Sequence, residues 1–186
     1  MASPALDAII AAKRANPFTP DKSVEQLRQE YSSTINIEAM PKGTTITEVN
    51  TGGVTAEWTR AQGAATDCVF LFIHGGGYIR GAVVANRVTA ALISAASGAT
   101  TLSTGYRLAP ENPFPAAIDD VHNAYRWLLA QDIDPKRIVV GGISAGGGLT
   151  LSLLLKLKEL GDPMPAAAVP MSAWTDLAQT GASFQS

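Results

Sequence analysis

A serine in a glycine-rich turn is the residue of this sequence best placed to act as a nucleophile. Residues 142–146 read Gly-Ile-Ser-Ala-Gly, between a strand-like run, "RIVVGGI", and a helix-like run that ends near Leu160. In a sharp strand-to-helix turn of this kind the serine is strained and its hydroxyl exposed, and the residues two before and two after lie too close for a Cβ atom. Gly142 and Gly146 satisfy that demand, so we predict that Ser144 is a nucleophile.

Three consecutive glycines begin the following helix and need a reason. Each glycine costs about 0.8 to 1 kcal/mol relative to alanine, so residues 146–148 together cost roughly 2 to 3 kcal/mol. A phosphate-binding loop would carry a lysine directly after its glycines, whereas the next lysine here is Lys156. A dinucleotide fingerprint would follow the first strand of the sheet. The pattern fits neither, and close packing remains the structural alternative to a nucleophile turn.

A second glycine-rich segment, "HGGGY", follows the apolar run "CVFLFI". A serine that attacks an acyl carbonyl needs hydrogen-bond donors aimed at the oxygen that becomes negative, and consecutive glycines let backbone N–H groups approach that oxygen. We predict donors at Gly76 and Gly77, and a third at the N–H of Ala145, at the positive end of its helix. Because both segments end buried strands, they are expected to meet at one edge of a sheet.

A serine nucleophile also needs a base, and the chain has two histidines. His74 belongs to the glycine-rich loop and is expected to brace it through hydrogen bonds. His122 lies in a helical segment beside Tyr125 and Leu129, where a satisfied surface or interfacial histidine is expected. Neither is the predicted base.

The acidic residues close to these segments are expected to be structural. Asp119 and Asp120 are predicted to set the start of a helix, and Asp176 is predicted to fix a loop after the last strand. Glu111 is predicted to pair with Arg107. None of them is expected to orient a base.

The remaining sequence indicates which elements hold these residues. Residues 3–37 predict short amphipathic helices, and residues 44–60 predict an antiparallel hairpin around Asn-Thr-Gly-Gly. Beyond residue 63, strands alternate with three helices, the last of which follows Ser144. The strands are continuous apolar runs, as expected where helices cover both faces. We therefore predict an α/β fold with a mostly parallel sheet.

Composition limits the function classes. The 186 residues are 46% hydrophobic, enough for one domain or most of one. A net charge of −2 makes nucleic acid and anionic membranes poor candidates for partners. The single cysteine, Cys68, is expected to be a packed strand residue and fits a reducing compartment. With no signal-peptide pattern and no run of ~20 apolar residues, a cytoplasmic location is expected.

Four motifs together resemble the hormone-sensitive-lipase-like family of α/β-hydrolase esterases: "HGGGY" at 74–78, "YRLAPENPFPAAIDD" at 106–120, "GISAGG" at 142–147 and "MSAWTDL" at 171–177. The resemblance implies hydrolysis of small-molecule carboxylic esters through an acyl-enzyme on Ser144, with no metal or organic cofactor. It also implies a helical cap over the active site. We assign residues 1–40 to this cap and residues 41–186 to the N-terminal portion of the hydrolase core.

The sequence departs from the family pattern at two points. Most members have aspartate before the nucleophile, where this chain has Ile143, which we interpret as a variant that packs against the sheet. In α/β-hydrolases the acid and the histidine of the triad follow the serine, yet no histidine follows Ser144. We therefore expect these residues to be the first part of a longer polypeptide, whose remainder supplies both triad partners.

Other functions stay open at this point. The same site could hydrolyse amides or N-acyl groups, because the motifs do not fix the leaving group. A non-catalytic protein that binds a small ligand on the same scaffold is the alternative from another class, since some hormone receptors resemble this family and lack the catalytic histidine. Assembly into a homo-oligomer is possible under either function.

Overall fold

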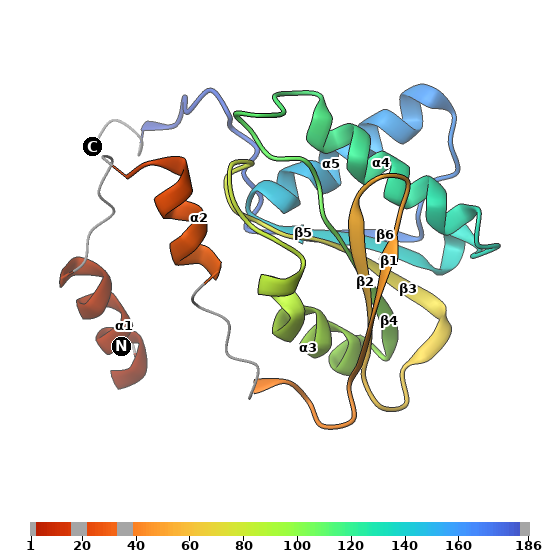
Figure 1. Cartoon of the computed structure of the whole chain (residues 1–186), viewed down its shortest axis with the longest axis horizontal. Coiled ribbons are helices and arrows are strands. Elements are labelled where there is room, and N and C mark those ends of the chain that lie inside the picture. The colour runs from red at the N-terminus through yellow and green to blue at the C-terminus, as the bar shows by residue number, and fades with distance from the viewer. Residues whose placement is uncertain (1–2, 16–21, 33–38, 183–186) are drawn as a thin grey trace.

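The computed structural model describes residues 3–15, 22–32 and 39–182, in which six strands form one sheet in the order β1-β2-β4-β3-β5-β6 (Figure 1). The strands are β1 (Thr45–Asn50), β2 (Thr55–Arg60), β3 (Ala65–Ile73), β4 (Ala99–Thr104), β5 (Ile138–Ile143) and β6 (Ala167–Met171). The helices are α1 (Pro4–Ala15), α2 (Val24–Ser32), α3 (Arg87–Ser97), α4 (Ala116–Leu129) and α5 (Ala145–Leu160), with 3-10 turns η2 (Val84–Asn86) and η3 (Pro135–Arg137).

The first two strands form the predicted hairpin. β1 and β2 are antiparallel, with Thr45 opposite Arg60 and Asn50 opposite Thr55. The side chain of Asn50 accepts a hydrogen bond of 2.8 Å from the backbone N–H of Gly53, which helps to close the turn. β2 also runs antiparallel to β4, so the hairpin extends one edge of an otherwise parallel sheet.

The parallel part of the sheet is built around β3. This strand pairs with β4 on one side and with β5 on the other, and Leu71 lies opposite both Leu102 and Val140. Its last five residues, 69–73, are all buried, as the continuous apolar run predicts for a strand covered on both faces. The predicted mostly parallel α/β sheet is confirmed.

Helices cover the two faces of this sheet unequally. α3 packs on one face, and α4 and α5 pack on the other (Figure 1). Leu149, Leu153 and Leu157 recur every four residues on α5, so they share the face that is buried against the sheet and α4. The three helices predicted beyond residue 63 are present as α3, α4 and α5.

α1 and α2 lie to one side of the sheet layers in Figure 1. The helices predicted within residues 3–37 are present, although residues 16–21 and 33–38 lie outside the described part of the chain. The division into a cap and a core at residue 40 stays a prediction. Cys68 is half-buried in β3.

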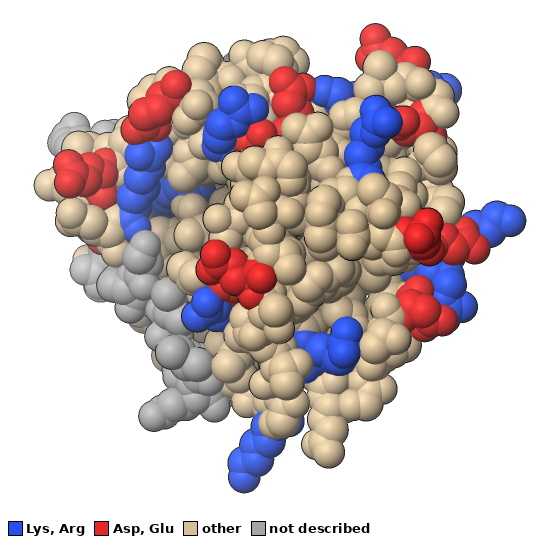
Figure 2. Space-filling model, turned by 45° about the vertical axis from the view of Figure 1, so that its right-hand side comes forward, with Lys and Arg blue, Asp and Glu red and all other residues tan. Residues whose placement is uncertain are grey.

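Surface charge and helix hydrophobicity bear on possible partners of the protein. On the face in Figure 2, acidic and basic side chains alternate without a broad patch of one sign. Among the described helices, none combines the length and the apolar character required to cross a bilayer.

Candidate active site

Ser144 occupies the junction between β5 and α5 in a strained backbone conformation. Its φ is 56° and its ψ is −116°, a region that residues other than glycine rarely adopt. The backbone N–H of Ser144 donates to the carbonyl of Met171 at 3.0 Å, and its carbonyl accepts from Gly148 and Trp174, both at 3.0 Å. These three bonds hold the strained residue from both sides, and the side chain stays partly exposed.

The glycines around Ser144 are required by close backbone contacts. A Cβ atom on Gly142 would lie 2.4 Å from the carbonyl oxygen of Gly146, and one on Gly146 would lie 2.1 Å from the carbonyl oxygen of Ile73. As predicted, there is no room for a side chain at the positions two residues before and two residues after the serine. Gly147 and Gly148 are equally confined, since their Cβ atoms would lie 2.8 Å and 2.7 Å from the segment after β6.

The loop after β3 is brought directly against this turn. Ile73 pairs with Gly142 in the parallel ladder, so the residues that follow each strand emerge side by side. A Cβ atom on Gly75 would lie 2.8 Å from the carbonyl oxygen of Ile143 and 3.4 Å from the Cβ of Ser144. The expected convergence of the two glycine-rich segments is confirmed.

Positive φ angles shape the loop itself. Gly76 has φ 125° and Gly77 has φ 64°, conformations that glycine adopts at little cost. The carbonyl of Gly76 accepts hydrogen bonds from the N–H groups of Ile79 and Arg80, at 3.3 and 3.1 Å. In a trans peptide the C=O and the following N–H point in opposite directions, so this turn directs the N–H of Gly77 away from its own centre.

A cavity of about 380 Å³ lies between the two segments. It is lined by Tyr31, Gly75, Gly76, Gly77, Arg80, Asn86, Ile143, Ser144 and Trp174. Three of the four predicted site residues, Ser144, Gly76 and Gly77, therefore face one space. Ala145 is fully buried behind the serine, and as the first residue of α5 its N–H has no partner within the helix.

Sequence reasoning missed the side chains that wall this cavity. Tyr31 comes from α2, and Trp174 comes from the segment after β6. The guanidinium of Arg80 lies 5.9 Å from the centre of the Tyr31 ring, and the rings of Tyr78 and Trp174 are 5.9 Å apart. The tryptophan stands inside the "MSAWTDL" motif, which was a usable signal. Nothing local in the sequence links Tyr31 to a serine more than a hundred positions away.

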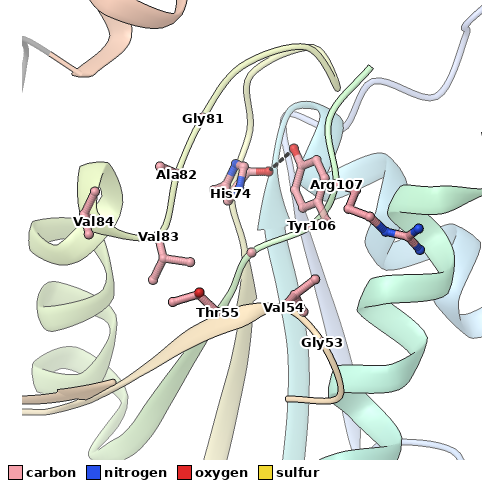
Figure 3. Close-up of a pocket in the computed structure, with 11 residues that line it drawn as sticks. Gly53, Val54, Thr55, His74, Gly81, Ala82, Val83, Val84, Tyr106 and Arg107 are labelled. Carbon is pink, nitrogen blue, oxygen red and sulfur yellow. Dashed lines mark hydrogen bonds between the residues drawn. The ribbon is translucent and has the colours of Figure 1, made fainter. Parts of the chain in front are cut away.

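His74 faces away from this cavity, toward a different one. Its ring stacks on Tyr106 with centres 4.3 Å apart, and the Tyr106 hydroxyl donates to the His74 carbonyl at 3.1 Å (Figure 3). Nδ1 lies 2.8 Å from the carbonyl of Gly75, which can only accept, so Nδ1 carries the proton. Burial lowers the pKa of His74 to about 4. The predicted bracing role of His74 is supported by these contacts.

His122 is a structural residue, as predicted. It is buried on α4, and its Nε2 lies 2.6 Å from a carboxylate oxygen of Asp162, just beyond the end of α5. This contact ties the two helices together at a distance from the Ser144 turn.

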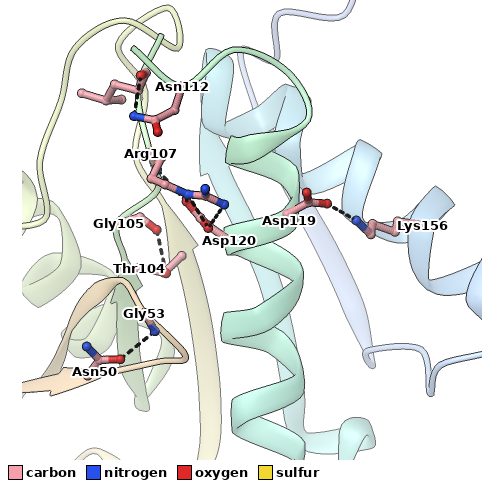
Figure 4. A network of polar contacts seen from close by, with 10 residues as sticks. Asn50, Gly53, Thr104, Gly105, Arg107, Asn112, Asp119, Asp120 and Lys156 are labelled. Atoms are coloured by element: carbon pink, nitrogen blue, oxygen red, sulfur yellow. Dashed lines mark hydrogen bonds and ion pairs between the residues drawn. The ribbon is translucent and has the colours of Figure 1, made fainter.

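The predicted pairing of Glu111 with Arg107 was wrong. Arg107 pairs with Asp120 at 2.8 Å and not with Glu111, because its backbone N–H also donates to the same carboxylate at 2.7 Å (Figure 4). Asp119 lies in the first turn of α4, where it binds Lys156 of α5, and no side chain caps the start of this helix. Glu111 pairs instead with Arg28 of α2.

Asp176 fixes the loop after β6, as predicted. One of its oxygens accepts hydrogen bonds from the backbone N–H groups of Thr180 and Gly181 and from the Thr180 hydroxyl, at 2.7 to 3.1 Å. These donors lower the pKa of the Asp176 carboxyl, led by the hydroxyl of Thr180.

Comparison with known proteins identifies the family. Residues 70–186 match a family model described as the alpha/beta hydrolase fold. An acetyl-hydrolase of Streptomyces hygroscopicus is 39% identical over 98% of this chain, and a putative acetyl-hydrolase, LipR, of Mycobacterium tuberculosis is 39% identical over 74% of it. The chain spans 61% of the first relative's length and 45% of the second's.

Solved structures give the same result. The structure of an esterase/lipase from an uncultured bacterium superposes with a TM-score of 0.93 at 37% identity, over 99% of this chain and 63% of that one. An esterase of the bacterial hormone-sensitive lipase family gives 0.88 at 42% identity, over 97% and 61%. The chain therefore belongs to the α/β-hydrolase family, in its hormone-sensitive-lipase-like branch.

Proposed function

We propose that the protein is a serine esterase that hydrolyses carboxylic esters through an acyl-enzyme on Ser144. The observation that carries this proposal is the shared cavity, in which a strained serine faces two backbone glycines held at positive φ. The names of the relatives, acetyl-hydrolase and esterase, support the same reaction. They also make short acyl groups such as acetyl the first substrates to test.

The proposed reaction assigns one task to each group. The Ser144 oxygen attacks the ester carbonyl carbon and its proton passes to a base. The N–H groups of Gly76, Gly77 and Ala145 receive the negative charge that develops on the carbonyl oxygen. The C–O bond to the leaving group breaks, the base returns the proton to the alcohol, and water then hydrolyses the acyl-enzyme by the reverse sequence.

The base belongs, in this proposal, to polypeptide outside these 186 residues. His74 is held by Gly75 and Tyr106 and lines a different cavity, and His122 is bound to Asp162. Among the described residues, no side chain hydrogen bonds to the hydroxyl of Ser144. Relatives of which this chain spans only about three fifths are long enough to contain both an acid and a histidine in the remainder.

Two further assignments accompany this function. Residues 1–40 form part of a cap over the site, and the support for this is that Tyr31 of α2 lines the cavity of Ser144. A cytoplasmic location is supported by the single cysteine, because a lone thiol suits a reducing compartment.

The test is a serine substitution in the natural protein that contains this chain. Ser144→Ala should lower kcat for p-nitrophenyl acetate and butyrate by at least about 10⁴-fold, because no other group can form the acyl-enzyme. Intact-mass measurement should show one organophosphate adduct on the wild type and none on the variant. Ser152→Ala, two turns along α5, is the matched control and should retain both activity and labelling.

Three outcomes separate the possibilities. Unchanged hydrolysis in Ser144→Ala would reject the nucleophile. A folded wild type that neither hydrolyses esters nor accepts the organophosphate would indicate the ligand-binding alternative. Hydrolysis of N-acetylated amides at rates comparable with those of esters would redirect the assignment to an amidase or deacetylase.

A further inference from the structure

One side chain of the cap joins it to both loops beside the site. Arg28, on α2, donates from Nε to the carbonyl of Ile79 at 2.7 Å and from Nη2 to the carbonyl of Ala109 at 3.0 Å. The same guanidinium binds both carboxylate oxygens of Glu111, at 2.8 and 2.7 Å. A single cation thus connects three groups that come from two loops about thirty residues apart in sequence.

The first of these groups belongs to the turn that carries the candidate donors. Residues 76–80 form a tight turn, since Gly76 accepts from the N–H groups of Ile79 and Arg80. The carbonyl of Tyr78 accepts from the N–H of Ala109 at 2.9 Å, and the carbonyl of Ile79 accepts from Arg28. Two consecutive carbonyls at the tip of the turn are therefore bound from outside, one by the backbone of Ala109 and one by Arg28.

The direction of the Gly77 N–H depends on this turn. The Gly76 carbonyl and the Gly77 N–H belong to one trans peptide and point in opposite directions. If Ile79 and Arg80 moved, the carbonyl of Gly76 would lose the donors that fix it, and the whole peptide plane could rotate. A donor that has rotated away from the oxyanion position no longer stabilises the transition state.

We propose that Arg28 is a positioning residue that fixes the backbone donor of Gly77 through its bond to Ile79. This inference rests on the proposed esterase function. Arg28 also holds α2, whose Tyr31 lies one helical turn further on and lines the cavity of Ser144. The same side chain thereby holds the cap helix α2 in place and orients the backbone donor of Gly77.

The energetics separate positioning from simple stabilisation. The side chains of Arg28 and Glu111 are 32% and 57% exposed, and exposed ion pairs contribute only about 0 to 1 kcal/mol to folding. Loss of the ion pair should therefore change the stability of the fold little. Its effect should appear in kcat, because small displacements of catalytic groups can cost about 10²-fold.

Lysine cannot replace the geometry of Arg28. Its ammonium is a compact point charge, whereas the guanidinium presents several donors in a planar fork. Arg28→Lys can keep an interaction with Glu111 but cannot reach the carbonyls of Ile79 and Ala109 as well. Glu111→Gln, in contrast, leaves the two carbonyl bonds intact, so it should affect the turn less than either change at Arg28.

The experiment measures steady-state kinetics on the natural protein that contains this chain, with a short p-nitrophenyl ester. Arg28→Met should lower kcat by about 10- to 100-fold and change KM by less than about 3-fold. Arg28→Lys should recover only part of this loss, and Glu111→Gln should lose less than about 5-fold. Affinity for an alkyl boronic acid, whose adduct with serine carries a tetrahedral oxyanion, should fall in parallel with kcat.

A matched control removes a similar ion pair elsewhere. Arg137 pairs with Asp67 at 2.6 Å, with 45% and 66% of the side chains exposed, and lies at the opposite end of β5 from Ser144. Arg137→Met should leave kcat, KM and boronate affinity within about 2-fold of the wild type, as expected of an exposed pair.

The other possible outcomes each support or overturn the proposed role of Arg28. A kcat for Arg28→Met within 2-fold of an active wild type would overturn it and leave the esterase function intact. An inactive wild type would remove the esterase function and this inference together. If Arg28→Met fails to fold, Arg28→Lys decides: reduced kcat at unchanged melting temperature supports positioning, and unchanged kcat rejects it.

Discussion

The two glycine-rich segments beside Ser144 are held in place by different means. In the turn at 142–146 the backbone packs directly against its own atoms and against the end of β3, and added Cβ atoms would lie 2.1 to 2.4 Å from carbonyl oxygens of β3 and of the turn. The loop at 74–81 is held by groups from distant parts of the chain. Tyr106 braces its base through the His74 carbonyl, while Ala109 and Arg28 bind its tip.

This difference predicts different consequences of mutation. The turn around Ser144 is confined by contacts between backbone atoms, so substitutions within it should destabilise the fold before they affect the rate. The loop after β3 depends on contacts made from outside, so changes there or in its supports should affect the rate more than the fold. Four experiments, ordered by expected effect, test this contrast.

The largest effect should come from Gly146→Ala. The new Cβ would lie 2.1 Å from the Ile73 carbonyl and 2.5 Å from that of His74, and backbone atoms on both sides cannot yield. We expect a loss of more than about 4 kcal/mol in the free energy of unfolding by urea, or failure to fold. Gly161→Ala is the control: with φ 71° and no atom within 4 Å, it should lose about 1 kcal/mol. Similar losses in both would contradict the steric account.

Gly76→Ala should come second and act on the rate. Its Cβ would lie 2.0 Å from the Arg80 carbonyl, which must move and carry the Gly77 peptide with it. We expect kcat to fall about 10²- to 10³-fold in ester hydrolysis, as when an oxyanion donor is lost. Gly53→Ala, at φ 112° with no atom within 4 Å, is a strained control outside the site and should keep full kcat. Equal losses of activity would show a general folding defect.

The third experiment concerns pH and His74. Its pKa is about 4 in the folded protein, and near 6.5 in an unfolded chain. Between these values the unfolded chain takes up a proton that the folded protein does not. Stability should therefore be complete above pH 6.5 and decline as the pH falls to 4, by about 3 kcal/mol. Urea unfolding should show this slope, and His74→Gln should flatten it. An unchanged slope in the variant would assign the decline to other groups.

The smallest effect should come from the ion pair at the tip of the loop. Arg28 lowers the pKa of Glu111 to about 2, mainly through a hydrogen bond, from about 4.5. A depressed carboxyl pKa stabilises the fold above pH 4.5, and this contribution is lost as the pH falls toward 2. Glu111→Gln should make the urea midpoint slightly less pH-dependent below 4.5, and added salt should reduce the difference. A variant whose midpoint differs from that of the wild type as much near pH 2 as at pH 7 would contradict this origin.

The contrast also explains what the sequence could predict. Gly142, Ser144 and Gly146 were identifiable because the strand, the strained residue and the helix occupy consecutive positions in the sequence. The order of apolar runs likewise predicted the parallel sheet, since strands buried on both faces leave a continuous signal. The strand and the helix on either side of Ser144 could thus be predicted from the sequence alone.

Contacts between distant segments could not be read in the same way. The pairing of Glu111 with Arg28, and of Arg107 with Asp120, depends on where α2 and the start of α4 lie in space. Opposite charges close in sequence suggested a different partner, because charge alone does not select among neighbours that only the fold creates. The position of Tyr31 at the cavity was likewise unpredictable, because it depends on where α2 lies in the fold.

Under the proposed esterase function, the composition of the cavity walls determines where new substrate preferences can arise. Around Ser144 the backbone leaves no room for added side chains, so random mutagenesis at Gly75, Gly142 or Gly146 should return mostly non-functional clones. Tyr31, Ile143 and Trp174 present replaceable side chains to the same space. A library confined to these three positions would vary the shape offered to an acyl or alcohol group and leave the chemistry in place, which makes them the natural starting point for redesign.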